Sequence, residues 1–355
     1  MIKEETFAAE WLEQFRKQIQ YRKINPPVFE KMVYALLLLE RLVQSGLEFI
    51  FKGGTSMVLL IKNPDRFSVD IDIMTEESKA DIEKSLKYVV SNSRFTGWEE
   101  DLRESNVSVP KTHYKLFYKS DINPNAEILL DVLFEKCYYL QTVKVPVASS
   151  WVMSEEPYVE VTVPGVDSLL GDKLTAFAPN TTGIPYHSGK HIEIIKQLHD
   201  VGRLADNMID IKLVADTFRK VAMRQIDYRK LAIGPEDACD DIIDTALMIA
   251  RESRKMNKGE DTVKMAEIQD GIRGFQGFLM YGGFHLADAV VAAAKSAYLA
   301  AKIKTGDNTP VERYSGIVSG QINNMEYNYL NRMQKINKEA FYYWKETFLI
   351  LKLEY

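Results

Sequence analysis

Cysteine is scarce in this chain, with only Cys137 and Cys239 among 355 residues. This excludes a small secreted scaffold held by disulfides, because such chains are dense in cysteine. Two cysteines far apart in the sequence are typical of buried thiols in a reducing compartment. We therefore expect a cytoplasmic protein.

Long hydrophobic runs are also missing. The longest purely apolar run near the start covers residues 35–39, whereas a helix that crosses a membrane needs about 20 such residues. The first residues, MIKEETFAAEWLEQF, include several acidic ones and no apolar core, which argues against a secretory signal. We expect no membrane partner.

Positive charge is not in excess either. The net charge is −5 and the pI is about 5.7, whereas a protein that coats nucleic acid through bulk charge is basic. An RNA partner would therefore need a local basic patch. The segment 212–230, rich in lysine and arginine, is one candidate, although a solvated helix face explains the same pattern and is the interpretation that we favour.

The remaining composition is that of a folded protein of two domains. Hydrophobic residues make up 46% and charged residues 27%, ordinary values for globular proteins. A chain of this length predicts about two domains. After Pro164-Gly165 the strand-like alternation of apolar and polar residues almost disappears and long helical patterns follow. We predict an α+β chain with a mixed sheet in an N-terminal domain, residues 1–165, and an all-helical domain, residues 166–355.

Hydrophobic periodicity and turn residues predict the individual elements. Strands are expected at residues 47–51, 67–74, 114–118, 127–134 and 158–163. Helices are expected in the first stretch and at residues 28–44, 55–61, 78–90, 166–178, 189–206, 211–231, 236–256, 261–279, 284–304 and 326–352.

A glycine turn joins the first expected strand to a helix in the segment Lys52-Gly53-Gly54-Thr55-Ser56. Glycine lets a backbone approach a ligand closely. The start of the helix offers unpaired N–H groups and the positive end of the helix dipole, and two hydroxyl side chains accompany them. The segment therefore predicts a phosphate-binding turn.

Three aspartates follow on the expected strands. Asp70 and Asp72 are two residues apart, so on a strand both carboxylates point to one face. Their charges repel unless a divalent cation lies between them. Asp131 lies inside an apolar run, where a carboxylate needs a partner or a metal. A site for Mg²⁺ or Mn²⁺ is thus predicted. The alternatives are a solvated strand face for the pair, and a strand end or a pairing with Arg66 or a lysine for Asp131.

The turn and the aspartates together resemble the nucleotidyltransferase superfamily, whose fold is polymerase-β-like. With Arg66 and Ser68 just ahead of the Asp-x-Asp pair, the sequence is more specifically similar to the AbiEii/AbiGii toxin family. The start of an expected helix, Asp172-Lys173-Leu174-Thr175-Ala176, matches the Lys-Leu-x-Ala pattern of that family.

A later helix of the family, with an Asp-x-x-Asp-Leu-like pattern, is resembled by residues 196–201. This chain departs from the pattern in two places, because Gln197 stands where the first Asp is usual and His199 where an aromatic residue is common. Asp200 remains. The resemblance covers roughly residues 30–205, and the last 150 residues match no family that we can name.

The resemblance implies a metal-dependent transfer of a nucleoside monophosphate from a nucleoside triphosphate to an acceptor, with the helical domain closing the nucleotide cleft. It implies that Asp70, Asp72 and Asp131 are catalytic and hold the metal, and that Lys173 is catalytic by neutralising phosphate charge. The residues that it implies for nucleotide binding are Lys52, Gly53, Gly54, Thr55, Ser56, Arg66, Ser68 and Asp200.

Several alternatives stay open for single residues and for the function. Arg66 could be structural and Ser68 could cap a turn. Lys173 could be an exposed lysine at the start of a helix, and Asp200 could either orient Lys173 or be an ordinary helix residue. The family implies an RNA, such as tRNA, or a protein as acceptor, and a cognate antitoxin. The alternative functions are transfer to a small molecule of the antibiotic type, and nucleotide binding without transfer.

Overall fold

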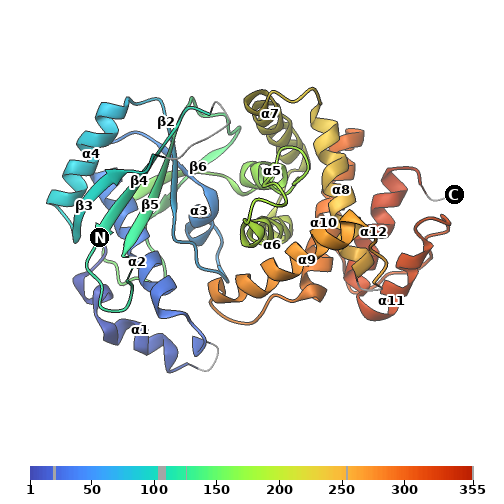
Figure 1. Cartoon of the computed structure of the whole chain (residues 1–355), viewed down its shortest axis with the longest axis horizontal. Helices are drawn as coiled ribbons and strands as arrows, with labels where there is room; N and C mark the ends of the chain where they lie inside the picture. Colours follow the sequence, from blue (N-terminus) through green and yellow to red (C-terminus); the bar gives the residue numbers. More distant parts are fainter. Residues whose placement is uncertain (19–20, 103–108, 125, 253–254, 354–355) are drawn as a thin grey trace. The chain divides into compact units, whose positions relative to one another are not determined.

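The computed structural model describes residues 1–18, 21–102, 109–124, 126–252 and 255–353 (Figure 1). The chain divides into two compact units: residues 1–165 with 277–283, and residues 166–276 with 284–355. Strands and helices are mixed in the first unit and the second is built of helices, so the predicted α+β class is confirmed. Among the residues described, no helix is long and apolar enough to cross a membrane.

A five-stranded mixed sheet is the scaffold of the first unit. Its strand order is β1-β2-β5-β4-β3, with β2 parallel to β5 and the other neighbours antiparallel. A separate antiparallel pair is formed by β6 and β7. The elements of this unit are η1 (Glu4–Phe7), α1 (Ala9–Arg16), α2 (Pro26–Gln44), β1 (Ile50–Lys52), α3 (Gly53–Leu60), β2 (Ile71–Thr75), α4 (Lys79–Ser91), β3 (Phe95–Glu100), β4 (Lys111–Tyr118), β5 (Glu127–Phe134), β6 (Thr142–Pro146) and β7 (Glu160–Pro164).

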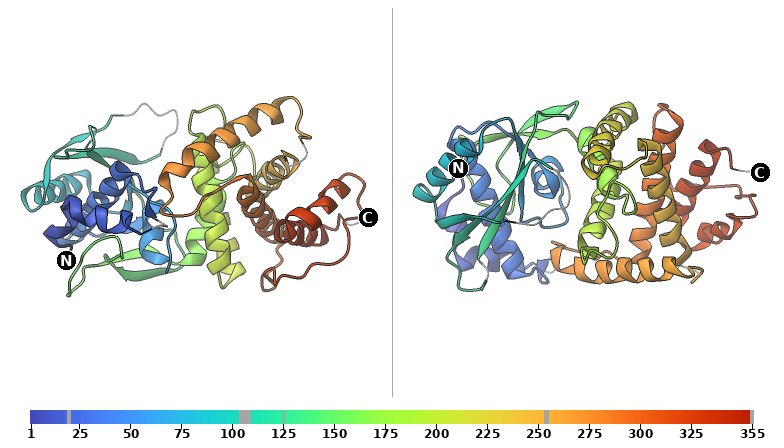
Figure 2. Two further views of the ribbon diagram at one scale, coloured as in Figure 1. Left: turned by 90° about the horizontal axis from the view of Figure 1, so that it is seen from below. Right: turned by 45° about the horizontal axis from the view of Figure 1, so that its top comes forward.

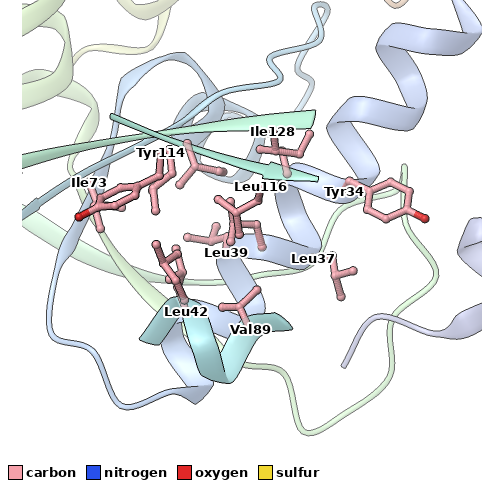
Figure 3. Packing of buried hydrophobic residues seen from close by; sticks show 14 of the residues in the cluster. Tyr34, Leu37, Leu39, Leu42, Ile73, Val89, Tyr114, Leu116 and Ile128 are labelled. Carbon is pink, nitrogen blue, oxygen red and sulfur yellow. The ribbon is translucent and has the colours of Figure 1, made fainter. Parts of the chain in front are cut away.

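One face of the sheet is covered by α2 and α4. Figure 3 shows Leu42 of α2 and Val89 of α4 on the side of the sheet where Ile73, Tyr114 and Ile128 lie. Each of these side chains is fully buried, which stabilises the fold by roughly 1.5–3 kcal/mol per large apolar side chain. Because side chains alternate along a strand, residues next to these core positions lie on the opposite face, and that face carries the charged residues described below.

A segment from the helical half of the sequence completes the first unit. Residues 277–283, called the strap from here on, belong to this unit. Leu279 forms an antiparallel bridge with Arg66, and the N–H of Phe67 donates to the carbonyl oxygen of Phe278 over 2.7 Å. The strand predicted at 67–74 is therefore wrong at its start, since the backbone around Phe67 pairs with the strap and enters the sheet only at Ile71.

The strap also fills a second apolar core of the first unit. Met280 is 1% exposed and belongs to a cluster with Phe29, Phe67 and Trp151. Its N–H donates to the carbonyl oxygen of Asp65 over 2.8 Å. The helix predicted over 261–279 consequently ends early, at Phe275, and a short 3-10 turn over residues 276–278 overlaps the start of the strap.

Replacing Met280 by alanine is expected to lower the free energy of unfolding of the first unit by about 2–5 kcal/mol, the usual result of truncating a buried methionine. The fluorescence of Trp151, in the same cluster, reports this transition in a urea titration. The matched control is Met325→Ala, because Met325 is 90% exposed. Equal midpoints for the two variants would show that the strap does not stabilise the unit.

The second unit is a bundle of helices in which α10 packs against α6, α8 and α12 (Figure 2). Its helix α5 packs against α7, where Gly171 approaches the backbone of Val214 so closely that a Cβ would lie 2.7 Å from its carbonyl oxygen. The elements of this unit are α5 (Val166–Ala176), α6 (His191–Asn207), α7 (Ile211–Arg229), α8 (Pro235–Glu252), α9 (Glu260–Phe275), α10 (Leu286–Thr305), η4 (Asn328–Arg332), α11 (Met333–Ile336) and α12 (Lys338–Ile350). The short 3-10 helix η3 (Gln276–Phe278) includes the first two residues of the strap.

Three further elements differ from the sequence-based expectation. The single helix predicted at 326–352 is wrong, because Asn337 interrupts it and its side chain caps α12 by accepting from the N–H of Ala340. The strands β3 and β6 were not predicted. Both lie at the edge of a sheet and show mostly exposed or half-buried side chains. In β3 the apolar residues do not alternate with polar ones, and in β6 the alternation covers only Val143 and Val145, which is too short to indicate a strand.

Candidate active site

Four charged or ionisable residues lie in one row across the face of the main sheet opposite α2 and α4. The register pairs Lys52 of β1 with Asp72 of β2, Asp72 with Asp131 of β5, and Asp131 with His113 of β4. Residues directly opposite each other on neighbouring strands share a face of the sheet. The four residues, called the polar row, therefore lie side by side on the face opposite the core of α2 and α4.

Within the polar row, Asp131 has a defined partner. Nδ1 of His113 lies 2.7 Å from Oδ1 of Asp131, and both side chains are about one quarter exposed, at 22% and 26%. This partner is neither Arg66 nor a lysine, the two alternatives that the sequence suggested. The strand β5 continues past Asp131 to Phe134, so Asp131 does not end it either.

Asp70 departs from its predicted place. The sequence suggested that Asp70 and Asp72 share a strand, but β2 begins at Ile71 and Asp70 precedes it. The hydroxyl of Thr55 donates to the carbonyl oxygen of Asp70 over 2.6 Å, so this carbonyl is bonded to α3 before the chain joins the sheet. Asp70 therefore lies two residues before Asp72 in the sequence but is not a member of the polar row.

The two glycines of the turn bring the sequence motifs together. Gly53 has a φ of +78°, and a Cβ at this position would overlap Oδ2 of Asp72. A Cβ at Gly54 would lie 2.5 Å from Nη2 of Arg66 and 3.0 Å from Oγ of Ser68. The turn thus lies directly against the Asp72 carboxylate on one side and against Arg66 and Ser68 on the other.

Replacing Gly53 by alanine is expected to lower the transfer rate by about a hundredfold, because displacing a reacting group by ~1 Å has an effect of this size. The methyl group collides with the Asp72 carboxylate and must push it aside. Gly46→Ala is the matched control, since Gly46 has a φ of +82° but open space around it. It keeps the left-handed strain of about 1–2 kcal/mol without the collision. If Gly53→Ala and Gly46→Ala transferred nucleotide at equal rates, the close approach of Gly53 to the Asp72 carboxylate would not matter for the reaction.

The hydroxyls of the turn are engaged inside the protein. Thr55 and Ser56 are fully buried, and the Ser56 hydroxyl donates to the carbonyl oxygen of Gly53 over 2.8 Å. Arg66 is 6% exposed and its Nη1 donates to the carbonyl oxygen of Phe67 over 3.0 Å. These three side chains shape the turn, so the predicted phosphate-binding role of the two hydroxyls passes to the backbone N–H groups at the start of α3.

In the second unit, a buried ion pair joins the two sequence motifs at residues 172–176 and 196–201. Nζ of Lys173 on α5 lies 2.9 Å from Oδ2 of Asp200 on α6, and it also donates to Oε1 of Gln197 over 2.9 Å. The two charged side chains are 8% and 0% exposed. Of the two alternatives for Asp200, the structure shows the one in which it orients Lys173, and Gln197 contributes to the same arrangement.

His199 departs from the family pattern in residue type but not in surroundings. Its ring lies 5.0 Å from that of Phe275 and 5.4 Å from that of Phe284, centroid to centroid. The side chain is 6% exposed. The histidine therefore occupies an aromatic environment, consistent with the aromatic residue common at this position.

The donor set of the polar row suits a hard divalent cation. Asp72 and Asp131 lie at one register on neighbouring parallel strands, which run about 4.8 Å apart. Mg²⁺ is commonly held by one or two carboxylates together with substrate phosphates, so these two residues fit it. In the part of the chain that the structure describes, no three His, Cys, Asp or Glu side chains are gathered closely enough to hold a metal ion by themselves.

Three of the six cationic side chains of the basic segment 212–230 are engaged by partners within the second unit. Lys212 pairs with Asp216 at 2.5 Å. Arg219 and Arg229 donate to backbone carbonyl oxygens of their own unit. These contacts support the interpretation of this segment as a solvated and structural helix face.

Individual known proteins resemble this chain only among solved structures, at low sequence identity. No curated protein matches the chain. Among solved structures, it is similar to MenT4, a nucleotidyltransferase toxin from Mycobacterium tuberculosis, with 14% identity, 83% of this chain and 98% of that chain covered, and a TM-score of 0.48. It is also similar to JHP933 from Helicobacter pylori, with 12% identity, 78% and 93% covered, and a TM-score of 0.43.

A family model described as the nucleotidyl transferase AbiEii toxin of a type IV toxin–antitoxin system matches residues 37–280. This match covers more than half of the chain, including the glycine turn, the polar row, the pair of Lys173 and Asp200, and most of the strap. The chain belongs to the AbiEii family of nucleotidyltransferase toxins.

Proposed function

We propose that this toxin transfers a nucleoside monophosphate from a nucleoside triphosphate to an RNA or protein acceptor and releases pyrophosphate. One observation carries the proposal: the carboxylates of Asp72 and Asp131 lie at the same register, and the glycine turn at the start of α3 lies against Asp72. A place for phosphates and a place for a divalent cation thus adjoin each other.

The aspartates take the roles of metal ligands in this proposal. Asp72 and Asp131 hold Mg²⁺ or Mn²⁺, and Asp70, which lies outside the polar row in this structure, would have to turn toward them to add a third carboxylate. When bound, the cation neutralises negative charge on the phosphates and polarises them. Asp131, which is one quarter exposed, also positions the acceptor hydroxyl or accepts its proton.

The turn and the cationic residues hold the triphosphate in this proposal. The N–H groups of Gly54, Thr55 and Ser56 donate to phosphate oxygens at the positive end of the α3 dipole. Arg66 and Ser68 fix the shape of the turn from the outside, and Lys52 adds a positive charge at the end of the polar row. Lys173, oriented by Asp200, neutralises phosphate charge that develops in the transition state.

The test is an assay for transfer of label. The protein is incubated with each nucleoside triphosphate labelled at the α-phosphate, Mg²⁺, and either total RNA or RNase-treated cell lysate. Label is expected in one macromolecular fraction and to depend on Mg²⁺. A labelled small molecule other than the donor and its breakdown products would point to a small-molecule acceptor. Absence of any labelled product besides the donor and its breakdown products would contradict transfer.

The family also suggests a cognate antitoxin as partner. We propose that the protein expressed without an antitoxin arrests growth, and that the product of a neighbouring gene relieves the arrest. Normal growth at high expression of the intact protein would count against the toxin activity in this chain.

A further inference from the structure

The partner of Asp131 was not indicated by any sequence motif. His113 lies in β4 directly opposite Asp131, with its Nδ1 at 2.7 Å from Oδ1. An ionised carboxylate only accepts hydrogen bonds, so the imidazole must be the donor through Nδ1–H. This bond engages one oxygen of the carboxylate and leaves Oδ2 for a ligand.

The backbone that carries His113 is fixed on both sides. On one side β4 pairs with β5 through residues from Lys111 to Phe117. On the other side the carbonyl oxygen of His113 accepts from the N–H of Asp101 over 2.8 Å. The next residue, Tyr114, points into the core and is fully buried, and burial raises the pKa of Tyr114 to about 12. The imidazole therefore starts from a rigid position.

The surroundings of the pair argue against a purely structural role. Both side chains are about one quarter exposed, and a hydrogen bond between partly exposed side chains contributes little net stability. On its other flank Asp131 has Asp72, whose negative charge would turn an unrestrained Asp131 side chain away. A donor on the far side holds Asp131 in the row against this repulsion.

We propose that His113 is a positioning residue for nucleotide transfer: its Nδ1–H bond to Oδ1 orients the Asp131 carboxylate so that Oδ2 is presented to the cation and the acceptor. This rests on the proposed function, because it assigns His113 a role through Asp131. Hydrogen bonds that orient carboxylate and imidazole ligands typically change metal affinity or activity by 10–100-fold.

The test compares His113→Ala, His113→Asn and Asp131→Ala in the transfer assay at varied Mg²⁺. H113A is expected to lower the rate about 10–100-fold and to raise the half-saturating Mg²⁺ concentration about tenfold, with little change in the KM of the donor triphosphate. In H113N the side-chain amide replaces Nδ1–H as donor, so most of the rate and the original Mg²⁺ dependence should return. Adding H113A to D131A should lower the rate no further than D131A alone.

The matched control is His187→Asn in the second unit. His187 forms the same kind of pair, with Nδ1 2.5 Å from Oε1 of Glu267, and asparagine tolerates its positive φ. H187N should leave the rate and the Mg²⁺ dependence unchanged. A thermal midpoint of H113A equal to that of the wild type would show that its effect does not come from unfolding, and H113N decides the matter if H113A fails to fold.

Three results would overturn the role of His113. One is a wild-type rate and Mg²⁺ dependence in H113A while Asp72→Asn and D131A are inactive. The second is a loss in H113A that persists undiminished in the D131A background. The third is H113N behaving as H113A does. A wild-type rate in both D72N and D131A is a different result, because it would refute the proposed function itself.

Discussion

Replacing Asp72 by asparagine is expected to lower the rate of nucleotide transfer on the order of a thousandfold. A cation held against the phosphates contributes several kcal/mol of transition-state stabilisation, and each 1.4 kcal/mol corresponds to about a factor of ten in rate. Asp72 adjoins Asp131 in the sheet and lies against Gly53. Asparagine keeps its shape and removes only the charge, so the unfolding midpoint should stay close to that of the wild type.

The control for this prediction is Asp121→Asn, a change of the same kind at an exposed position of the first unit. It should leave the transfer rate unchanged. The same substitution at Asp70 measures how much the carboxylate that precedes β2 contributes. A D72N protein that transfers label as fast as the wild type, while D121N does too, would remove the polar row from the mechanism.

Replacing Asp200 by alanine is expected to lower the stability of the second unit by about 3–5 kcal/mol, because it leaves the buried charge of Lys173 with the neutral amide of Gln197 and without the Asp200 carboxylate. The two side chains are 8% and 0% exposed, so water cannot replace the carboxylate. Urea unfolding followed through the fluorescence of Trp344, which is fully buried in this unit, measures the loss.

Asp216→Ala provides the comparison within the same unit. Asp216 pairs with Lys212 at the surface, with side chains 39% and 65% exposed, and such pairs contribute about 0–1 kcal/mol. Equal losses in D200A and D216A would contradict the prediction. The double variant K173M/D200L should recover much of the stability, since an apolar replacement of both partners is often neutral. If this folded variant transfers no label, Lys173 has a chemical role besides its structural one.

Local patterns predicted the glycine turn and the apolar alternation of the central strands. Gly53 and Gly54 lie between β1 and α3 as expected, because a strand, a flexible turn and a helix start each leave a signature within a few residues. Asp72 and Asp131 are flanked by buried apolar residues on both sides, which was visible as alternation. What they do for a substrate remains a prediction.

Features that depend on distant pairings could not be predicted. His113 is one polar residue in an ordinary strand, and only the register of β4 on β5 brings it to Asp131. The position of Asp70 outside β2 follows from a hydroxyl fifteen residues earlier and from the pairing of Arg66 with Leu279, more than two hundred residues later. Neither contact has a local signature.

The strap has a consequence for the order in which the protein is made. During translation, residues 1–165 leave the ribosome long before residues 277–283 exist, and N-terminal domains generally begin to fold first. Until Leu279 has been made, the backbone at Arg66 cannot form its bridge to the strap. The guanidinium group of Arg66, which lies against Gly54, is therefore attached to a segment that is not yet held in place. Nascent chains and products of premature termination before the strap therefore lack the backbone pairing of residues 65–67, so the segment that carries Arg66 and Ser68 is held in place only after most of the chain has been made.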